Sequence, residues 1–257
     1  MSEVETLAVE HEMLHPNVGT LSCHNLVKRY GQRTVVNEIS VDVNQGEIVG
    51  ILGPNGAGKT TTFYMLVGII RPNGGSVTLG ERDITKKAMY ERARYGLGYL
   101  PQEASIFKKM TVEDNLHAVL EFTKMKKKER NERVEELLTE FRLIDRRKVH
   151  GGLLSGGERR RVEIARTLAS RPAYILLDEP FTGIDPIAVD EIQDIVLTLK
   201  NKGIGVLITD HNVRETLSIT DRSYIVFEGK VLTTGTSEEI LNDEFARKHY
   251  LGQDFNF

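Results

Sequence analysis

Short apolar stretches separated by turns dominate the first part of the chain. The turns are marked by Gly31, by the pair Gln45 and Gly46, and by the segment 73–75. The stretches between them are rich in β-branched and aliphatic residues and cover residues 21–26, 39–43, 47–52 and 76–79. Runs of this length bounded by turn residues predict β-strands.

The middle of the chain has a different pattern. From about residue 113 to residue 143, apolar residues recur at helical spacing among many charges, most clearly in 134–141. This pattern predicts a helical insertion. Beyond it, strand-like runs at 174–178 and 206–209 enclose a helical segment at 187–199. Alternating strands and helices predict an α/β fold with a parallel sheet and crossover helices.

Composition narrows the possible functions. The chain has 257 residues, of which 40% are hydrophobic, enough for one domain with a subdomain or for two closely joined lobes. A net charge of −3 provides no general basic field, so we expect no nucleic-acid partner. The lone Cys23 cannot form an intrachain disulfide, which favours a reducing, cytoplasmic location.

The N-terminal segment and the length of the apolar runs indicate whether the chain itself enters a membrane. Residues 1–20 carry four glutamates and no apolar core of signal-peptide length, so we expect a flexible tail ahead of a domain at 21–257. No apolar run approaches the roughly 20 residues that cross a bilayer. We therefore expect membrane association only through a partner.

A glycine-rich segment follows the predicted strand 47–52 and precedes a helical run at 61–67. Its spacing matches a P-loop, in which backbone amides and a helix N-terminus surround phosphate oxygens. The lysine can then reach the β- and γ-phosphates of ATP, and the threonine after it can ligate Mg²⁺. The residues of this predicted ATP site are Gly53, Pro54, Asn55, Gly56, Ala57, Gly58, Lys59, Thr60 and Thr61.

Two adjacent carboxylates end the predicted strand 174–178. Because Asp178 and Glu179 point in different directions, one can face the metal while the other activates water. We assign Asp178 to Mg²⁺, through a water molecule, and Glu179 to the role of general base.

The segment Leu154 to Glu158, ahead of a helical run at 159–169, resembles the signature motif of ABC ATPases. Ser155, Gly156 and Gly157 would present a second phosphate-binding helix start. A chain with two such starts and one P-loop favours a head-to-tail pair with a second copy of itself. The resemblance implies that arrangement, with each ATP held between one copy's P-loop and the other copy's signature.

The resemblance covers nearly all of residues 21–257 and implies further roles. Tyr30 would stack on adenine, and Gln102 would touch Mg²⁺ and the attacking water. Asp185 would lie in the loop that crosses the dimer interface, and His211 would contact the γ-phosphate as a catalytic residue. The implied fold is a P-loop NTPase core with a parallel sheet, an N-terminal antiparallel β subdomain and an α-helical signature subdomain at about 104–168.

Within the family, four segments resemble the ATPases of bacterial lipopolysaccharide export transporters, namely residues 97–107, 156–166, 209–217 and 250–255. That resemblance implies transmembrane permease subunits as partners and a peripheral place on the cytoplasmic face of the inner membrane. Phe107 would lie in the groove that receives a permease helix or, alternatively, in the core of its own subdomain. The C-terminal tail would help to hold the dimer.

Two other kinds of ABC ATPase share much of the pattern, those of branched-chain amino-acid importers and the soluble iron–sulfur assembly type. A small-molecule kinase also uses a P-loop, but it would leave residues 154–158 without a purpose.

Overall fold

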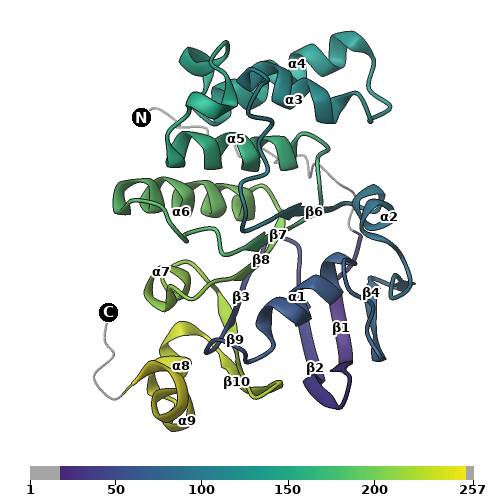
Figure 1. Cartoon of the computed structure of the whole chain (residues 1–257), viewed down its shortest axis with the longest axis vertical. Coiled ribbons are helices and arrows are strands. Elements are labelled where there is room, and N and C mark those ends of the chain that lie inside the picture. The colour runs from purple at the N-terminus through teal and green to yellow at the C-terminus, as the bar shows by residue number, and fades with distance from the viewer. Residues whose placement is uncertain (1–17, 253–257) are drawn as a thin grey trace, which may run out of the picture.

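The computed structural model describes residues 18–252, and the predicted tail 1–20 therefore lies mostly outside the described residues, as do 253–255 at the other end. Two sheets and a set of helices make up the described part (Figure 1). The first sheet is antiparallel with the order β2-β1-β4-β5. Its strands are β1 (Leu21–Tyr30), β2 (Arg33–Val43), β4 (Gly74–Leu79) and β5 (Arg82–Asp83).

The second sheet has the order β10-β9-β3-β8-β7-β6 and is parallel except for its β9–β10 edge. Its strands β3, β7 and β8 are buried at every residue, because helices or the first sheet cover both faces. The bounds are β3 (Ile48–Leu52), β6 (Leu97–Leu100), β7 (Tyr174–Asp178), β8 (Gly205–Thr209), β9 (Arg222–Phe227) and β10 (Lys230–Gly235). The predicted α/β fold with a parallel sheet is confirmed.

The helices fall into groups that Figure 1 separates. Helices α3, α4 and α5 lie together, with α6 next to them, whereas α1 lies on the other side of the strands near the first sheet. The bounds are α1 (Lys59–Val67), α2 (Met89–Arg94), α3 (Val112–Leu120), α4 (Lys127–Glu140), α5 (Gly156–Leu168), α6 (Pro186–Asn201), α7 (Val213–Leu217), α8 (Ser237–Asn242) and α9 (Glu244–Ala246). Short helical turns η1 (Ile144–Arg146), η2 (Gly151–Leu153) and η3 (Arg247–Leu251) complete the set.

The helical stretch expected from 113 to 143 is divided into two helices. Thr111 caps α3 by accepting a hydrogen bond from the Asp114 amide at 3.1 Å, and α4 starts again at Lys127. Phe141 and Leu143, at the end of α4 and just beyond it, are buried in the same core cluster as α3 and α5. The amphipathic pattern was therefore correct about the buried face but could not show where the chain turns between the helices.

Separate apolar clusters hold the two sides of the parallel sheet. One cluster packs the helices α3, α4, α5 and α6 against one face of the strands. The other packs the first sheet and α1 against the opposite face. In the described part of the chain, no helix is long and apolar enough to cross a membrane. The carboxyl ends of β3, β6, β7 and β8 share one edge of the parallel sheet, and the predicted chemistry gathers there.

Candidate nucleotide-binding and catalytic site

The P-loop lies between β3 and α1, and neighbouring backbone fixes its shape. Gly53 and Gly58 have φ values of 148° and 105°, which residues with a side chain rarely adopt. A Cβ on Gly53 would overlap the carbonyl oxygen of Val226, and one on Gly58 would lie 2.7 Å from the carbonyl oxygen of Val35. These glycines are therefore required by the protein's own packing, with or without a ligand.

The remaining residues of the loop line its open side. Ala57 is buried, and its carbonyl accepts a hydrogen bond from the Gly229 amide at 2.9 Å. Figure 1 shows the loop entering α1 at the edge of the strands. The exposed or partly exposed residues there are Pro54, Asn55, Gly56, Thr60 and Thr61. These five residues of the predicted ATP site are therefore open to solvent, whereas the other four are buried.

Lys59 is buried at the base of the loop, with 6% of its surface exposed. Its Nζ donates hydrogen bonds to the carbonyl oxygens of Gly53 at 2.6 Å and Pro54 at 3.0 Å. Burial lowers the pKa of Lys59, and the negative charges of Glu179 and Asp210 oppose that shift. The ammonium is thus held close to the place where phosphate oxygens would bind.

Asp178 ends β7 with 1% of its surface exposed. Among the described residues, neither carboxylate oxygen has a hydrogen-bond partner, although the hydroxyls of Tyr64 and Tyr99 approach it. Burial, reinforced by the charge of Glu179, raises the pKa of Asp178 to about 6. A buried carboxylate with two unsatisfied oxygens fits a cation that brings its own water.

The type of cation follows from the donors present. The described residues contain no group of three or more His, Cys, Asp and Glu side chains that could hold a metal ion alone. Magnesium commonly keeps several waters and binds through one or two protein oxygens plus substrate phosphates. The donor set of Thr60 and Asp178 therefore fits Mg²⁺ better than a cation that needs a full protein cage.

Glu179 is the centre of a polar cluster that contains the three predicted catalytic residues. Its Oε2 is 2.7 Å from Gln102 Nε2, 3.0 Å from Thr182 Oγ1 and 3.2 Å from His211 Nδ1. The backbone of Glu179 has a φ of 44°, and its amide donates to the Thr209 carbonyl at 2.7 Å. A left-handed conformation at a non-glycine residue is strained and is often found at functional sites.

The structure brings together Gln102, Glu179 and His211, which are far apart in the sequence. Thr182 was not predicted, although a hydroxyl three residues after a carboxylate in a turn is well placed to reach it. Asp210 also lies beside the cluster, since its Oδ1 is 3.6 Å from His211 Nδ1. It is fully buried, and its carboxylate accepts from the Phe181 amide at 3.0 Å and the Asn212 amide at 2.9 Å.

The signature segment caps α5. The Ser155 side chain accepts from the Glu158 amide at 3.2 Å, and the Glu158 carboxylate accepts from the Ser155 amide at 2.9 Å. A Cβ on Gly157 would lie 2.8 Å from Ala188, so packing against α6 requires that glycine. A Cβ on Gly156 would meet no atom within 4 Å, so within the described chain nothing requires a glycine there.

The signature does not approach the P-loop of its own chain. In Figure 1, α6 and strands of the parallel sheet lie between α5 and α1. Tyr30, at the end of β1, is 51% exposed, and Lys28 Nζ lies 5.2 Å from its ring centre. Asp185 is exposed at the start of α6 and accepts from the Ala188 amide at 3.1 Å, so it also has a structural role as a helix cap.

The sequence model of the ABC transporter family matches residues 36–182, more than half of the chain. The chain belongs to the ABC transporter family. "Lipopolysaccharide export system ATP-binding protein LptB" of Acidithiobacillus ferridurans is 58% identical over 235 residues, which are 91% of this chain and 98% of that protein. The protein of the same name from Escherichia coli strain K12 is 54% identical over 239 residues, 93% of this chain and 99% of that protein.

Solved structures lead to the same family. A nucleotide-free ATP-binding cassette from an ABC transporter has a TM-score of 0.81 at 31% identity, covering 91% of this chain and 99% of that one. A cassette in its ADP conformation has a TM-score of 0.81 at 30% identity, covering 91% and 98%. The predictions of an ABC ATPase and of nucleotide binding are confirmed.

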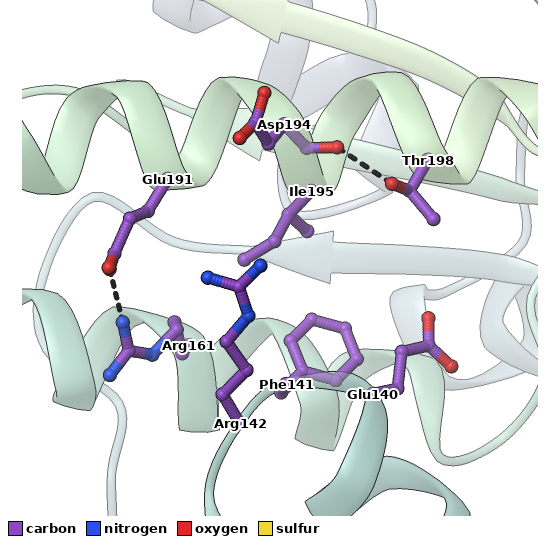
Figure 2. A pocket seen from close by; sticks show the side chains of 8 residues that line it. All are labelled: Glu140, Phe141, Arg142, Arg161, Glu191, Asp194, Ile195 and Thr198. Atoms are coloured by element: carbon purple, nitrogen blue, oxygen red, sulfur yellow. Dashed lines mark hydrogen bonds and ion pairs between the residues drawn. The ribbon is translucent and has the colours of Figure 1, made fainter.

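A hollow lies away from this site, between α4, α5 and α6 (Figure 2). Its volume is about 120 Å³, and none of the predicted site residues lines it. Arg161 and Glu191 form an ion pair at one side, and the guanidinium of Arg142 points toward Ile195. The hollow therefore lies where α6 meets α5 and the end of α4.

Proposed function

We propose that this chain is the ATP-hydrolysing subunit of a transporter that extracts lipopolysaccharide from the inner membrane and exports it. The supporting observation is that relatives 54–58% identical over nearly their whole length carry that function in their names. The chain would work as a pair of copies bound to transmembrane permease subunits, and it would lie on the cytoplasmic face through them.

The P-loop residues 53–61 would hold ATP. The amides at the start of α1 would face phosphate oxygens, and Lys59 could exchange for them the two loop carbonyls that its ammonium now binds. Thr60, Asp178 and Gln102 would hold Mg²⁺, the last two through water. When bound, Mg²⁺ would neutralise charge on the phosphates and orient them.

Glu179 would act as the general base that polarises the attacking water. Its Oε2 is already held by Gln102, Thr182 and His211, so the carboxylate has one fixed direction. His211 would contact the γ-phosphate from the same cluster.

A second copy would complete each ATP site. Ser155 and Gly156 are exposed, and the open space at Gly156 allows a phosphate to approach the first amides of α5 closely. Gly157 lies beside them at the same helix start. Tyr30 would stack on adenine from the first sheet, and Asp185 would lie across the interface between the two copies.

The helical subdomain at about 104–168 would receive the permease. Phe107 is 47% exposed, and the guanidinium carbon of Arg166 lies 4.9 Å from the centre of its ring. The alternative expectation, that Phe107 lies in its own subdomain's core, is wrong at this exposure. Aromatic and arginine side chains are enriched at protein interfaces, so this exposed pair is suited to contact a partner.

Polar bonds of two buried side chains connect the residues just before Phe107 to the residue next to Gln102. The carboxylate of Glu163, with 2% of the residue exposed, accepts from the amides of Ser105 at 2.6 Å and Ile106 at 3.1 Å. Arg160, which pairs with Glu163, donates to the carbonyl of Pro101 at 2.9 Å, next to Gln102. Movement of a partner at Phe107 would therefore reach the residue that touches Glu179.

The substitution Glu179→Gln tests the catalytic role. We expect hydrolysis to fall about 100-fold to 10,000-fold, because the base is lost while the amide keeps the shape of the side chain. ATP binding should persist, and an ATP-bound dimer should accumulate in size-exclusion chromatography. Only monomer at saturating ATP would contradict the shared site between two copies.

Purification from membranes tests the cargo. We expect two transmembrane proteins of a lipopolysaccharide exporter to co-purify with the chain, and Phe107→Ala to lose them while it still dimerises with ATP. Phe122→Ala is the matched control, since Phe122 is 93% exposed just beyond α3 and outside the proposed contact. Recovery of only soluble partners, or of amino-acid importer subunits, would overturn the exporter proposal.

A further inference from the structure

The C-terminal segment packs against the strand that leads into the P-loop. A small apolar cluster contains Leu52, the last residue of β3, together with Ile240 of α8 and Ala246 of α9. Tyr250 and Leu251 of η3 pack against it. Gly53, the first residue of the P-loop, follows Leu52 directly, so the C-terminal segment lies beside the base of the nucleotide site.

Local hydrogen bonds fix this segment in place. Asp243 caps α9 by accepting from the Ala246 amide at 2.7 Å, and it also accepts from Thr233 Oγ1 of β10 at 2.9 Å. The turn η3 is π-helical and ends where the Gly252 amide donates to the Arg247 carbonyl at 2.9 Å. A π-helical turn is rare and frequently occurs at a functional site.

The turn η3 carries Tyr250. Its hydroxyl is buried and faces the backbone amide of Gly53, yet among the described residues it has no completed hydrogen bond. Burial raises the pKa of Tyr250 to about 12, the Gly53 amide opposes the shift, and the charge of Asp210 adds to it. A buried hydroxyl without a partner is unfavourable and rare in folded proteins, so its position needs an explanation.

The neighbouring lysine supplies one. In this structure the Gly53 carbonyl accepts a hydrogen bond from Lys59 Nζ at 2.6 Å. Phosphate oxygens compete for the same ammonium, so nucleotide binding changes the hydrogen bonding of the Gly53 backbone. A tyrosine hydroxyl can both donate and accept, and here it faces the amide of the residue whose carbonyl would change its bonding.

We propose that Tyr250 is a positioning residue of the nucleotide site, whose hydroxyl pairs with the Gly53 backbone in the nucleotide-bound protein. Nucleotide binding and the C-terminal segment then stabilise each other, because a coupling between two sites acts equally in both directions. This inference rests on the proposed ATP site at residues 53–61 and adds the C-terminal segment to it.

The substitution Tyr250→Phe tests the pairing, because it keeps the ring in its apolar cluster and removes only the hydroxyl. It is made in the Glu179→Gln protein so that ATP is not consumed. Without nucleotide, we expect an unchanged or higher melting temperature, since an unsatisfied hydroxyl is removed. With ATP and Mg²⁺, we expect the dissociation constant to rise about threefold to tenfold, the effect of one lost hydrogen bond.

The substitution Tyr174→Phe is the matched control. The Tyr174 hydroxyl donates to the Gly19 carbonyl at 2.6 Å, and Tyr174 starts β7 at the sheet edge opposite the P-loop. Its loss should lower the melting temperature without nucleotide and leave ATP affinity unchanged. The two tyrosines should therefore give opposite patterns.

Hydrogen exchange gives a readout that does not depend on affinity. In the Glu179→Gln protein, ATP should slow exchange of the amides at 244–251, and Tyr250→Phe should lose most of that protection. ATP affinity within twofold of the parent together with unchanged protection would overturn the role of Tyr250. If the parent itself binds no ATP, the proposed function fails instead, which separates the two conclusions.

Discussion

The starts of α1 and α5 are both suited to bind phosphate, but they are built in opposite ways. At α1, the chain itself presses on Gly53 and Gly58, and Lys59 is already paired with loop carbonyls. At α5, the space around Gly156 is open, and Ser155 is exposed apart from its cap. The first start is shaped by its own protein, whereas the second has room for something from outside.

The difference separates the two halves of the proposed ATP site. Glycine at a positive φ under a neighbouring carbonyl is needed for folding, so its loss damages the protein before any ligand is considered. A glycine in open space, such as Gly156, can be substituted in the isolated chain without a clash. Only a second molecule that approaches it closely would require a glycine there. The comparison therefore predicts that stability and activity respond differently at the two starts.

The largest effect is expected for Gly53→Ala. The new Cβ would overlap the Val226 carbonyl at a φ of 148°, which should lower the free energy of unfolding by about 3 to 5 kcal/mol. Denaturant unfolding measures the change, and nucleotide binding should be lost with it. A stable, ATP-binding Gly53→Ala protein would show that the loop is not held by its own neighbours.

Asp178→Asn tests a second property of the P-loop half of the proposed site, the buried charge at the end of β7. The raised pKa of about 6 means that the folded protein binds the proton more tightly than the unfolded chain does. The stability that protonation provides is present below about pH 4 and is lost as the pH rises through about 6. Asparagine stays neutral, so we expect it to stabilise the nucleotide-free protein by about 1 to 3 kcal/mol at pH 8 and hardly at pH 4.

Glu158 on the α5 side provides the opposite control. The hydrogen bond from Arg146 at 2.6 Å, with one from the Ser155 amide, lowers the pKa of Glu158 to about 2. Its contribution to stability is present above about pH 4.5 and is lost as the pH falls toward 2. Glu158→Gln should therefore destabilise the protein at pH 7 and less so at low pH. The same pH dependence for both variants would contradict the assigned environments.

The sequence was sufficient to predict those parts of the site that are formed by residues close together in the chain. The P-loop spacing, the acids at the end of β7 and the cap at Ser155 all follow from residues close together in the chain, and the structure places them at the predicted elements. The strand β6 was not predicted, since only four residues form it and its pairing with β7 is long-range.

Long-range polar contacts could not be predicted in the same way. Thr182 and Tyr250 approach the site from a turn and from the C-terminal segment, and neither has a pattern that distinguishes it from a surface or core residue. From the sequence, Arg160 and Glu163 would be expected to be two charges on the exposed face of a helix. Only the tertiary packing shows that both side chains are buried. Such residues depend on which elements meet, and periodicity does not determine that.

Gly156→Ala returns to the open helix start. We expect the free energy of unfolding to stay within about 1 kcal/mol of the parent, because the methyl group meets no atom and alanine favours a helix. Hydrolysis should nevertheless fall at least about tenfold, because the methyl group stands where the partner's nucleotide approaches. Unchanged hydrolysis at protein concentrations that allow dimers would remove the case for the shared site.

The smallest effects are expected at the two helix caps that also face the proposed interface. Ser155→Ala and Asp185→Ala each remove a side-chain acceptor, at 3.2 Å from the Glu158 amide and 3.1 Å from the Ala188 amide. Each should lower the free energy of unfolding by about 1 kcal/mol. Replacing each with Asn restores a capping acceptor and should restore stability, so any loss of ATP-dependent dimerisation that remains in the Asn variants reports the contact with the second copy alone. Full recovery of dimerisation in both would show that Ser155 and Asp185 act only as caps.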